Sequence, residues 1–286
     1  MDPRVAIVII TRDRPDDLLR TLARLRALPE RPAVIVVDNG SAGGETARVA
    51  ARFPEVVVLA QERDLGAAGR TAGVLAAAAP YVAFCDDDSW WEPGSLSSAA
   101  DLLDAHPDVA LLAARVELEG GRLEPTCAEM AEGPLAGRPG LPGPPVLGFV
   151  ACGAVVRRDA YLAAGGFEPG WGVGGEEQPL AAELADRGWE LVYVDRVTAQ
   201  HRPSRRRDPA ARRRIATRND LWFAWRRRPA AAALRFTAGE LRRAAADRQR
   251  RAGLLAALRG APDAVRARRG VGPRAERRLA ELAPKR

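Results

Sequence analysis

The feature that most constrains the fold of this chain is an unbroken apolar segment near its N-terminus. Residues 5–10 read Val-Ala-Ile-Val-Ile-Ile, with no polar residue between Arg4 and Thr11. A strand with one face in water alternates apolar and polar residues. This run therefore predicts a strand covered on both faces, as in a parallel sheet flanked by helices. Six apolar residues are too few for a secretory signal or a membrane-spanning helix, so we expect a soluble protein.

The segments that follow alternate between strand and helix patterns. We expect strands at 33–37, 56–59, 81–85 and 190–194, and helices at 16–28, 45–52, 67–79 and 177–184. This order predicts an α/β fold with a Rossmann-like, mostly parallel sheet flanked by helices. Residues 117–145 are rich in Gly and Pro and are expected to form a long irregular excursion over a cleft. Ligands of such sheets bind at the carboxyl ends of the strands, so the polar residues there are the first candidates for a site.

The net charge of +7 conceals two parts of opposite charge. Residues 1–200 hold 18 basic and 30 acidic side chains, whereas residues 201–286 hold 26 and 7. The second part is also helical in pattern and poor in strand signals. We therefore predict an α/β domain over residues 1–202 and a basic, mainly helical C-terminal extension over residues 203–286.

Three adjacent carboxylates follow the strand expected at 81–85. Asp86, Asp87 and Asp88 repel one another unless positive charge neutralises them. A Mg²⁺ ion, which prefers carboxylate and phosphate oxygens, would supply that charge. Alternation along an extended strand puts Asp86 and Asp88 on one side, so these two are the expected ligand pair. The alternative is a solvated acidic turn that caps the segment after it.

Two other strand ends carry polar motifs. Asp38-Asn39-Gly40-Ser41 is either a simple β-turn or a loop that holds a base or ribose by hydrogen bonds. Residues 64–70 place two glycines before a helix, where the backbone can approach a phosphate, and Arg70 adds a fixed cation. The glycine spacing matches neither a dinucleotide-binding fingerprint nor a P-loop.

In this order along the chain, the motifs resemble those of family 2 glycosyltransferases. They are Thr11 with Arg14, Asp38–Ser41, Leu65–Arg70, Asp86–Asp88 followed by Glu92–Leu96, and Gly175–Glu177. The resemblance covers residues 4–202 and implies the A-type glycosyltransferase (GT-A) fold. It further implies an enzyme that transfers a sugar from a nucleotide-diphosphate sugar to an acceptor hydroxyl, with inversion at the anomeric carbon. Residues 1–202 would then be the nucleotide-sugar-binding and catalytic domain.

The resemblance also implies roles for the residues at the strand ends. The donor-binding group would be Thr11, Arg14, Asp38, Arg70, Asp86 and Asp87. Asp86 and Asp88 match the DxD motif, whose carboxylates contact the ribose or sugar and a divalent cation. His201 matches a further metal ligand of some A-type enzymes, and a nitrogen ligand would shift the preference from Mg²⁺ toward Mn²⁺. The cation would neutralise charge on the departing diphosphate.

Inversion by direct displacement also needs a base that takes the proton from the incoming hydroxyl. The glycine-rich loop at 171–177 ends in two carboxylates, Glu176 and Glu177. The family usually has Glu-Asp here and uses the second acid as the base. Glu177 is therefore the first choice and Glu176 the second. The alternative is that both carboxylates only cap the helix that follows.

The basic extension has several possible uses. Clusters such as Trp222–Arg228 can bind nucleic acid, an anionic membrane or a polyanionic acceptor, or the helices can pack on the catalytic domain with their arginines in water. No aromatic pattern of a base-stacking sheet is present, which makes nucleic acid the weaker explanation. Leucines spaced beside tryptophan and arginine fit binding at a membrane interface. We expect a cytoplasmic enzyme that can lie at the inner face of the plasma membrane and act on a lipid-linked or cell-envelope glycan.

Two other function classes stay open. A nucleotidyltransferase also needs a nucleotide site and acidic metal ligands, but its expected glycine-rich loop after the first strand is missing from residues 11–15. A nucleic-acid-binding protein would use the basic extension beside a non-catalytic α/β domain. Three widely spaced cysteines form no disulfide framework or zinc signature, which favours a reducing setting. The donor base, the sugar, the acceptor and the oligomeric state have no readable code in the sequence.

Overall fold

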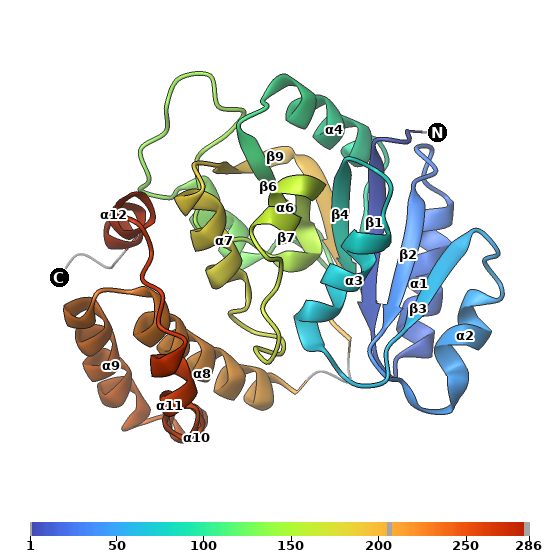
Figure 1. The fold of residues 1–286 in the computed structure, drawn as a ribbon. Coiled ribbons are helices and arrows are strands. Elements are labelled where there is room, and N and C mark those ends of the chain that lie inside the picture. The colour runs from blue at the N-terminus through green and yellow to red at the C-terminus, as the bar shows by residue number, and fades with distance from the viewer. Residues whose placement is uncertain (1, 205–207, 283–286) are drawn as a thin grey trace.

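The computed structural model describes residues 2–204 and 208–282, so residues 205–207 and 283–286 of the predicted extension lie outside the described residues. A nine-stranded sheet has the order β3-β2-β1-β4-β8-β6-β9-β5, with β7 paired to β6 (Figure 1). The strands are β1 Val5–Thr11, β2 Ala33–Asp38, β3 Val56–Ala60, β4 Tyr81–Asp86, β5 Ser89–Trp91, β6 Val109–Leu118, β7 Arg122–Leu123, β8 Ala154–Arg157 and β9 Glu190–His201.

Parallel pairing joins β3, β2, β1 and β4, and it also joins β6 to β9. Between these two parallel groups, β8 runs antiparallel to both β4 and β6. Helices cover both faces of the sheet, as the fold class predicted (Figure 1). The helices of this part are α1 Pro15–Arg26, α2 Glu45–Ala50, α3 Gly69–Ala76, α4 Ser95–Ala105, α5 Pro125–Ala131, α6 Arg158–Ala163 and α7 Glu177–Asp186.

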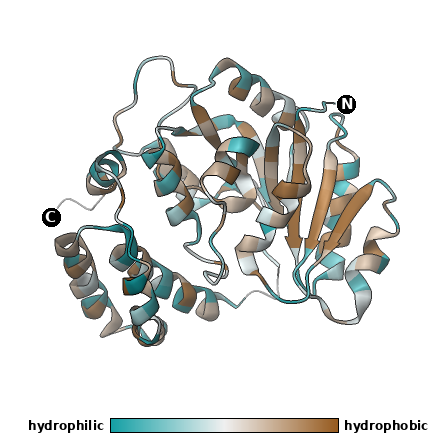
Figure 2. Ribbon diagram, viewed as in Figure 1, coloured by the Kyte–Doolittle hydropathy of each residue, from teal (hydrophilic) through white to brown (hydrophobic). Residues whose placement is uncertain are grey.

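The unbroken apolar run of β1 is explained by the two cores that it separates. Its odd-numbered members Val5, Ile7 and Ile9 pack with Leu18, Leu22 and Leu25 of α1 on one face. Its even-numbered members Ala6, Val8 and Ile10 pack with residues of α3, α6 and α7 on the other face. The apolar residues Val5–Ile10 of β1 are all buried, so a polar side chain at any of these positions would lose its water without a ready partner. Strands β1, β2 and β3 are accordingly among the most hydrophobic elements in Figure 2.

Two elements lacked a clear pattern in the sequence. Strand β6 was not expected, although it lies between β8 and β9. Strand β9 extends seven residues beyond the expected end at 194, because its polar second half pairs with β6 and β5. The excursion expected at 117–145 is also partly ordered, since it contains the end of β6, strand β7 and helix α5. Long-range pairing decides these elements, and local sequence patterns do not record it.

Residues 208–282 are mainly helical, as predicted. Its helices are α8 Pro209–Arg227, α9 Ala230–Ala244, α10 Arg248–Arg259, α11 Ala261–Arg266 and α12 Pro273–Glu281. The carboxylate of Asp208 accepts hydrogen bonds from two backbone N–H groups of the first turn of α8, and Asp247 does the same for α10. Leu221, Leu254 and Ala257 form a small separate core between α8 and α10. None of the helices within the described residues has the length and hydrophobicity needed to cross a bilayer.

This helical region does not stand apart from the sheet, because its last helix returns to contact α7 (Figure 1). Arg227 lies 2.8 Å from the nearly buried Glu183 of α7. Arg274 and Arg278 of α12 each lie 2.6 Å from the carboxylate of Glu190 at the start of β9. Part of the positive charge of the extension therefore neutralises acidic residues of the sheet domain.

Candidate active site

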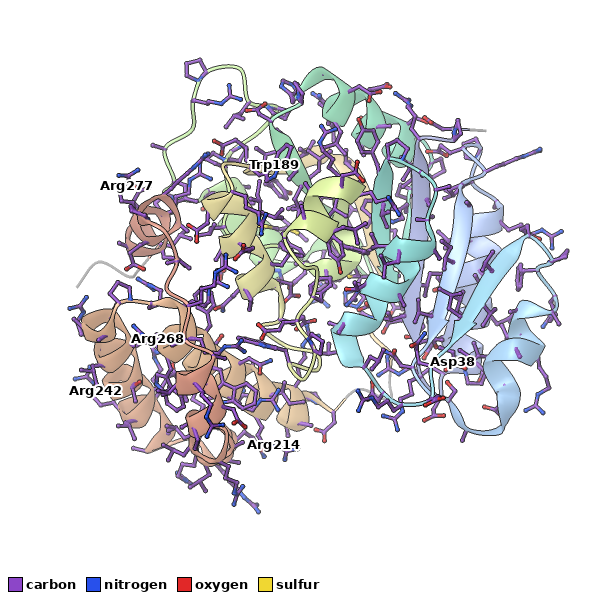
Figure 3. The ribbon with its side chains drawn as sticks, in the orientation of Figure 1. Asp38, Trp189, Arg214, Arg242, Arg268 and Arg277 are labelled. Atoms are coloured by element: carbon purple, nitrogen blue, oxygen red, sulfur yellow. The ribbon has the colours of Figure 1, made fainter. Side chains whose placement is uncertain are left out.

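The carboxyl ends of the parallel strands place the predicted site residues at the same edge of the sheet. In the sheet register, Thr11 at the end of β1 pairs with Asp38 at the end of β2, and Ile10 pairs with Asp86 at the end of β4. Asp38 lies at one end of the sheet, where the strands terminate (Figure 3). This convergence is the geometric result that the parallel-sheet rule predicts.

The three carboxylates at 86–88 do not follow strand alternation, since β4 ends at Asp86 and the next two residues turn into β5. Asp87 is buried and accepts hydrogen bonds from the Thr11 hydroxyl at 2.9 Å and from the Arg14 guanidinium at 3.2 Å. The Thr21 hydroxyl donates a hydrogen bond to the backbone carbonyl of Asp87 at 2.8 Å. Burial raises the pKa of Asp87 to about 7, although Arg14 opposes the shift. The repulsion within the triplet is thus relieved partly by cations and partly by a carboxyl that protonates easily.

Asp88 has a different set of neighbours. Its Oδ1 lies 3.5 Å from His201 Nε2, and its Oδ2 accepts a 2.8 Å hydrogen bond from the backbone N–H of Ser204. Arg14 reaches it at 3.9 Å and so contacts both Asp87 and Asp88. The end of β9 and the residues just after it therefore close over the acidic turn.

Asp86 pairs with Arg70 of α3, whose side chain is 1% exposed. The guanidinium also lies over the rings of Phe84 and Phe167, with its carbon 5.9 and 5.3 Å from their centroids. Its Nε and Nη1 atoms have no hydrogen-bond partner among the described residues. In addition to Asp86, Arg70 interacts electrostatically with Glu176 and Glu177. One buried cation therefore links the acidic turn to the candidate base.

A divalent cation fits the donor atoms at this end of the sheet. Among the described residues, one group of three possible ligands has its donor atoms within 4.8 Å of one another, namely Asp86, Cys152 and His201. Asp88 is not a member of this group, although it shares His201 with it. The residues present thus offer oxygen, nitrogen and sulfur donors to a metal.

A cleft of about 620 Å³ opens beside the acidic turn. Four of the predicted residues line it: Thr11, Arg14, Asp86 and Asp87. Residues of α8 and of the loop before α7 line it as well, among them Gly172, Val173, Arg212 and Ile215. The other predicted residues do not line it: Asp38, Arg70, Asp88, Glu176, Glu177 and His201. The first helix of the extension is therefore part of the cleft.

The motif at 38–41 forms a tight loop at the edge of the cleft. Asp38 Oδ1 accepts a 2.9 Å hydrogen bond from the backbone N–H of Ser41, as in a turn. Its neighbour Asn39 lines the cleft and donates to the carbonyl of Gly66 at 2.9 Å. Gly66 has a φ of +57°, and a Cβ there would lie 2.7 Å from Cα of Gly172. Glycine is therefore needed at 66 for the two loops to touch.

The loop that carries the candidate base is held mainly by α8. The side-chain amide of Asn219, which is 0% exposed, donates to the carbonyls of Trp171 at 2.9 Å and of Gly174 at 2.7 Å. Arg218 donates to the same Trp171 carbonyl at 2.6 Å. Trp171 packs edge-to-face on Trp222 with centroids 6.2 Å apart. The extension thus shapes the loop from outside.

Glu176 and Glu177 begin α7 in different environments. The buried Glu176 accepts a short hydrogen bond from the backbone N–H of Gly174. Glu177 is half-buried, and burial and the negative charge of Glu176 raise its pKa, while Arg70 and Arg212 oppose the shift. A carboxylate with a raised pKa is a better proton acceptor than an ordinary one, which suits a general base.

Three residues at this site were missed by sequence reasoning. Cys152 lies in an apolar segment and resembles a core residue, and Arg212 is one of many arginines in the extension. Asn219 has a signal that could have revealed it. The chain has only two asparagines, Asn39 and Asn219, and both donate to loop carbonyls beside the cleft.

Solved structures define the class of protein to which this fold belongs. GalNAc-T7 with UDP, GalNAc and Mn²⁺ has a TM-score of 0.58 and 14% identity, covering 78% of this chain and 50% of that one. The mannosyltransferase PcManGT from Pyrobaculum calidifontis, in complex with GDP-Man and Mn²⁺, has a TM-score of 0.57 and 17% identity, covering 99% and 76%. S. aureus TarS 1-349 in complex with UDP-GlcNAc has a TM-score of 0.57 and 16% identity, covering 78% and 66%. At such identities the likeness shows the fold alone, which is that of GT-A glycosyltransferases.

Sequence relatives narrow the class to a family. An N-acetylglucosaminyl-diphospho-decaprenol L-rhamnosyltransferase of Mycobacterium tuberculosis is 27% identical over 241 residues, which cover 72% of this chain and 78% of that protein. The uncharacterized glycosyltransferase Mb0553 of Mycobacterium bovis is 32% identical over 173 residues, covering 60% and 76%. Residues 6–163, more than half of the chain, match Glycosyl transferase family 2. The chain belongs to this family and is a glycosyltransferase.

Proposed function

We propose that the protein is an inverting, divalent-cation-dependent glycosyltransferase that transfers a sugar from a nucleotide-diphosphate sugar to a lipid-linked or cell-envelope glycan precursor. The observation that carries the proposal is the link between two acidic groups through Arg70. Asp86 at the end of β4 and Glu177 at the start of α7 both interact with this buried cation. The proposed metal ligand and the proposed base thus share one buried arginine, and Asp86 also lines the cleft.

The donor is proposed to bind in the cleft of about 620 Å³, whose volume is typical of small-molecule sites. The residues proposed to hold the nucleotide and sugar are Thr11, Arg14, Asp38, Arg70, Asp86 and Asp87. Asp86, Asp88 and His201 are proposed to hold Mg²⁺ or Mn²⁺. When bound, such a cation neutralises charge on the departing diphosphate. The two Mn²⁺ complexes among the solved structures support a cation in this fold.

Glu177 is proposed to act as the general base, with Glu176 as the second choice. Its carboxylate would take the proton of the acceptor hydroxyl while the sugar leaves the diphosphate. Glu176 contributes in either case, because its charge raises the pKa of Glu177. Asn219 and Arg218 would keep the base at a constant distance from the sugar by holding its loop.

The acceptor is proposed to be lipid-linked because the relative from M. tuberculosis is named for an acceptor on a decaprenol diphosphate. The extension over 203–286 would bring the catalytic domain over 1–202 to an anionic membrane surface at the cytoplasmic face. Leu234 and Leu241 of α9 are 71% and 57% exposed and lie seven residues apart, on one side of the helix. Arg242 is at the outer edge of the molecule (Figure 3). Leucine beside arginine on an exposed helix suits an interface with anionic lipids.

Nucleic acid is a weaker partner for the same region. Several of its arginines pair with carboxylates of the catalytic domain and are not free to meet phosphates, as Arg227 does with Glu183. Phosphates are bound by Lys and Arg side chains, so a nucleic-acid-binding surface does not account for the exposed leucines of α9.

The proposal is tested with a panel of nucleotide sugars, including activated L-rhamnose, and polyprenyl-diphosphate-linked N-acetylglucosamine as the acceptor. We expect one donor to raise the melting temperature in the presence of Mg²⁺ or Mn²⁺ and to be turned over with inversion. Asp88→Asn should abolish the metal dependence of both effects. If this variant keeps the metal-dependent turnover of the wild-type protein, the assignment of Asp88 is wrong. If no donor is turned over, the proposed reaction is wrong.

A further inference from the structure

A thiol lies in the group of possible metal ligands at the end of the sheet. Asp86 ends β4, His201 ends β9, and Cys152 lies in the short 3₁₀ helix Ala151–Gly153 that precedes β8. The three donor atoms lie within 4.8 Å of one another. Zinc binds sulfur at ~2.3 Å and nitrogen at ~2.0 Å in tetrahedral geometry, so these two ligand atoms on one ion are ~3.5 Å apart. Side-chain movements of about 1 Å therefore suffice for the donor atoms to bind a single ion.

The burial and the contacts of this group are typical of an ordered metal site and not of surface side chains that lie close together by chance. Cys152 and His201 are both buried, and Asp86 is held by its ion pair with Arg70. His201 comes within 3.5 Å of Asp88, so the same imidazole belongs to the acidic turn. Cys127, which is equally buried, bonds instead to the backbone of β6 and belongs to no such group within residues 2–204 and 208–282.

We propose that Cys152 is a ligand of the metal bound at this site, together with Asp86 and His201, and that it makes the site selective for thiophilic transition metals over Mg²⁺. The inference rests on the proposed cation dependence and adds a ligand to it. Mg²⁺ prefers oxygen donors and binds sulfur weakly, whereas Co²⁺ and Zn²⁺ bind thiolate and imidazole readily.

Metal binding at Cys152 has a defined proton balance. A free cysteine has a pKa of about 8.5, so the Cys152 sulfur carries a proton before the metal arrives. When the sulfur–metal bond forms, the sulfur–hydrogen bond breaks and the proton leaves to the buffer. The metal keeps its oxidation state, and no other reactant is needed. The positive charge of Arg70 next to Asp86 limits the affinity, and the thiolate compensates by adding a negative charge.

The test is a titration of the metal-free full-length protein with Co²⁺, followed by absorption. A cobalt–thiolate bond produces a charge-transfer band in the near ultraviolet that oxygen and nitrogen ligands do not produce. We expect this band in the wild-type protein and in the control Cys127→Ser, and its loss in Cys152→Ser. The Co²⁺ affinity of Cys152→Ser should fall about 10–100-fold, while its Mg²⁺ affinity should change little. A wild-type protein without the band, or a band that survives in Cys152→Ser, overturns the proposal.

A second measurement needs no variant and covers the case in which Cys152→Ser does not fold. X-ray absorption of the Zn²⁺-loaded wild-type protein should detect one sulfur neighbour at ~2.3 Å beside nitrogen and oxygen neighbours. A first shell of nitrogen and oxygen alone refutes the thiol ligand. Either readout is independent of sugar transfer. An enzyme that turns over its donor but shows no sulfur ligand refutes only this inference, whereas a sulfur ligand without turnover refutes only the proposed reaction.

Discussion

Replacing Asn219 by alanine tests whether the extension positions the candidate base. The Asn219 amide joins α8 to the loop at 171–177 through two hydrogen bonds, of 2.9 and 2.7 Å, to backbone carbonyls. These carbonyls belong to Trp171 and Gly174, and the backbone N–H of Gly174 is bonded to Glu176. Loss of the amide therefore frees the segment immediately before Glu177.

The magnitude follows from the two bonds and their burial. A typical net hydrogen bond is worth about 1 kcal/mol, and leaving a buried acceptor unpaired costs about 1–3 kcal/mol. The Gly174 carbonyl loses its donor, whereas the Trp171 carbonyl loses one bond and keeps that from Arg218, so the free energy of unfolding should fall by about 2–4 kcal/mol. For a chain of this size, that loss corresponds to a fall of about 5–10 °C in the melting temperature. A shift of about 1 Å in the base should reduce kcat about 100-fold.

The assay compares the wild-type protein, Asn219→Ala and the control Thr217→Val by thermal unfolding and steady-state transfer kinetics. Thr217 is buried on the same helix, but its hydroxyl donates to the carbonyl of Arg213 within α8. We expect both variants to melt earlier and only Asn219→Ala to lose kcat, with little change in the KM for the donor. If Asn219→Ala keeps wild-type kcat, or if Thr217→Val loses as much, the helix supports the fold in general and does not position the base.

The remaining predictions concern protonation and the membrane. Glu177→Gln should cut kcat about 10²–10⁴-fold and leave donor affinity unchanged; a larger loss in Glu176→Gln would reverse the two roles. In Glu176→Gln, the acid limb of the pH–rate profile should move to lower pH, because the charge that raises the pKa of Glu177 is gone; an unmoved limb contradicts the assignment. Folding raises the pKa of Asp87 from 3.8 to about 7, so in the metal-free protein its contribution to stability is full below about pH 4 and is lost as the pH rises through about 7. The melting temperature of Asp87→Asn relative to wild type should therefore rise between pH 5 and 8, and a constant difference would show that the pKa of Asp87 is not raised. Leu241→Asp should weaken sedimentation with anionic liposomes without changing transfer to a soluble acceptor analogue; equal sedimentation would exclude α9 from the membrane contact.

The opposite net charges of residues 1–200 and 201–286 have a structural explanation. The counts of charged residues alone did not suggest it. Glu183 lies on α7 and Glu190 starts β9, and both are nearly buried beneath arginines of the extension. Removal of one of these carboxylates would leave partly buried cations unpaired, which is costly. The extension is therefore docked on the sheet domain, and Arg242 and Arg277 lie on its outer side (Figure 3).

The residues themselves determined the fold class, because the apolar run of β1 and the alternating segments after it are compatible with few architectures. They also predicted which strand ends hold the candidate site residues, since Thr11, Asp38 and Asp86 each follow a recognisable strand pattern. Both inferences use local patterns of burial and chain direction, which a sequence records directly.

Only the tertiary structure decided how those strand ends meet the rest of the chain. It ended β4 at Asp86, so that Asp87 contacts Thr11 whereas Asp88 contacts His201. It brought Cys152 to His201 and Asn219 to the base loop, across 49 and 45–48 residues of sequence. Contacts of this kind depend on how elements pack over long sequence separations, and local residue patterns carry no record of that packing.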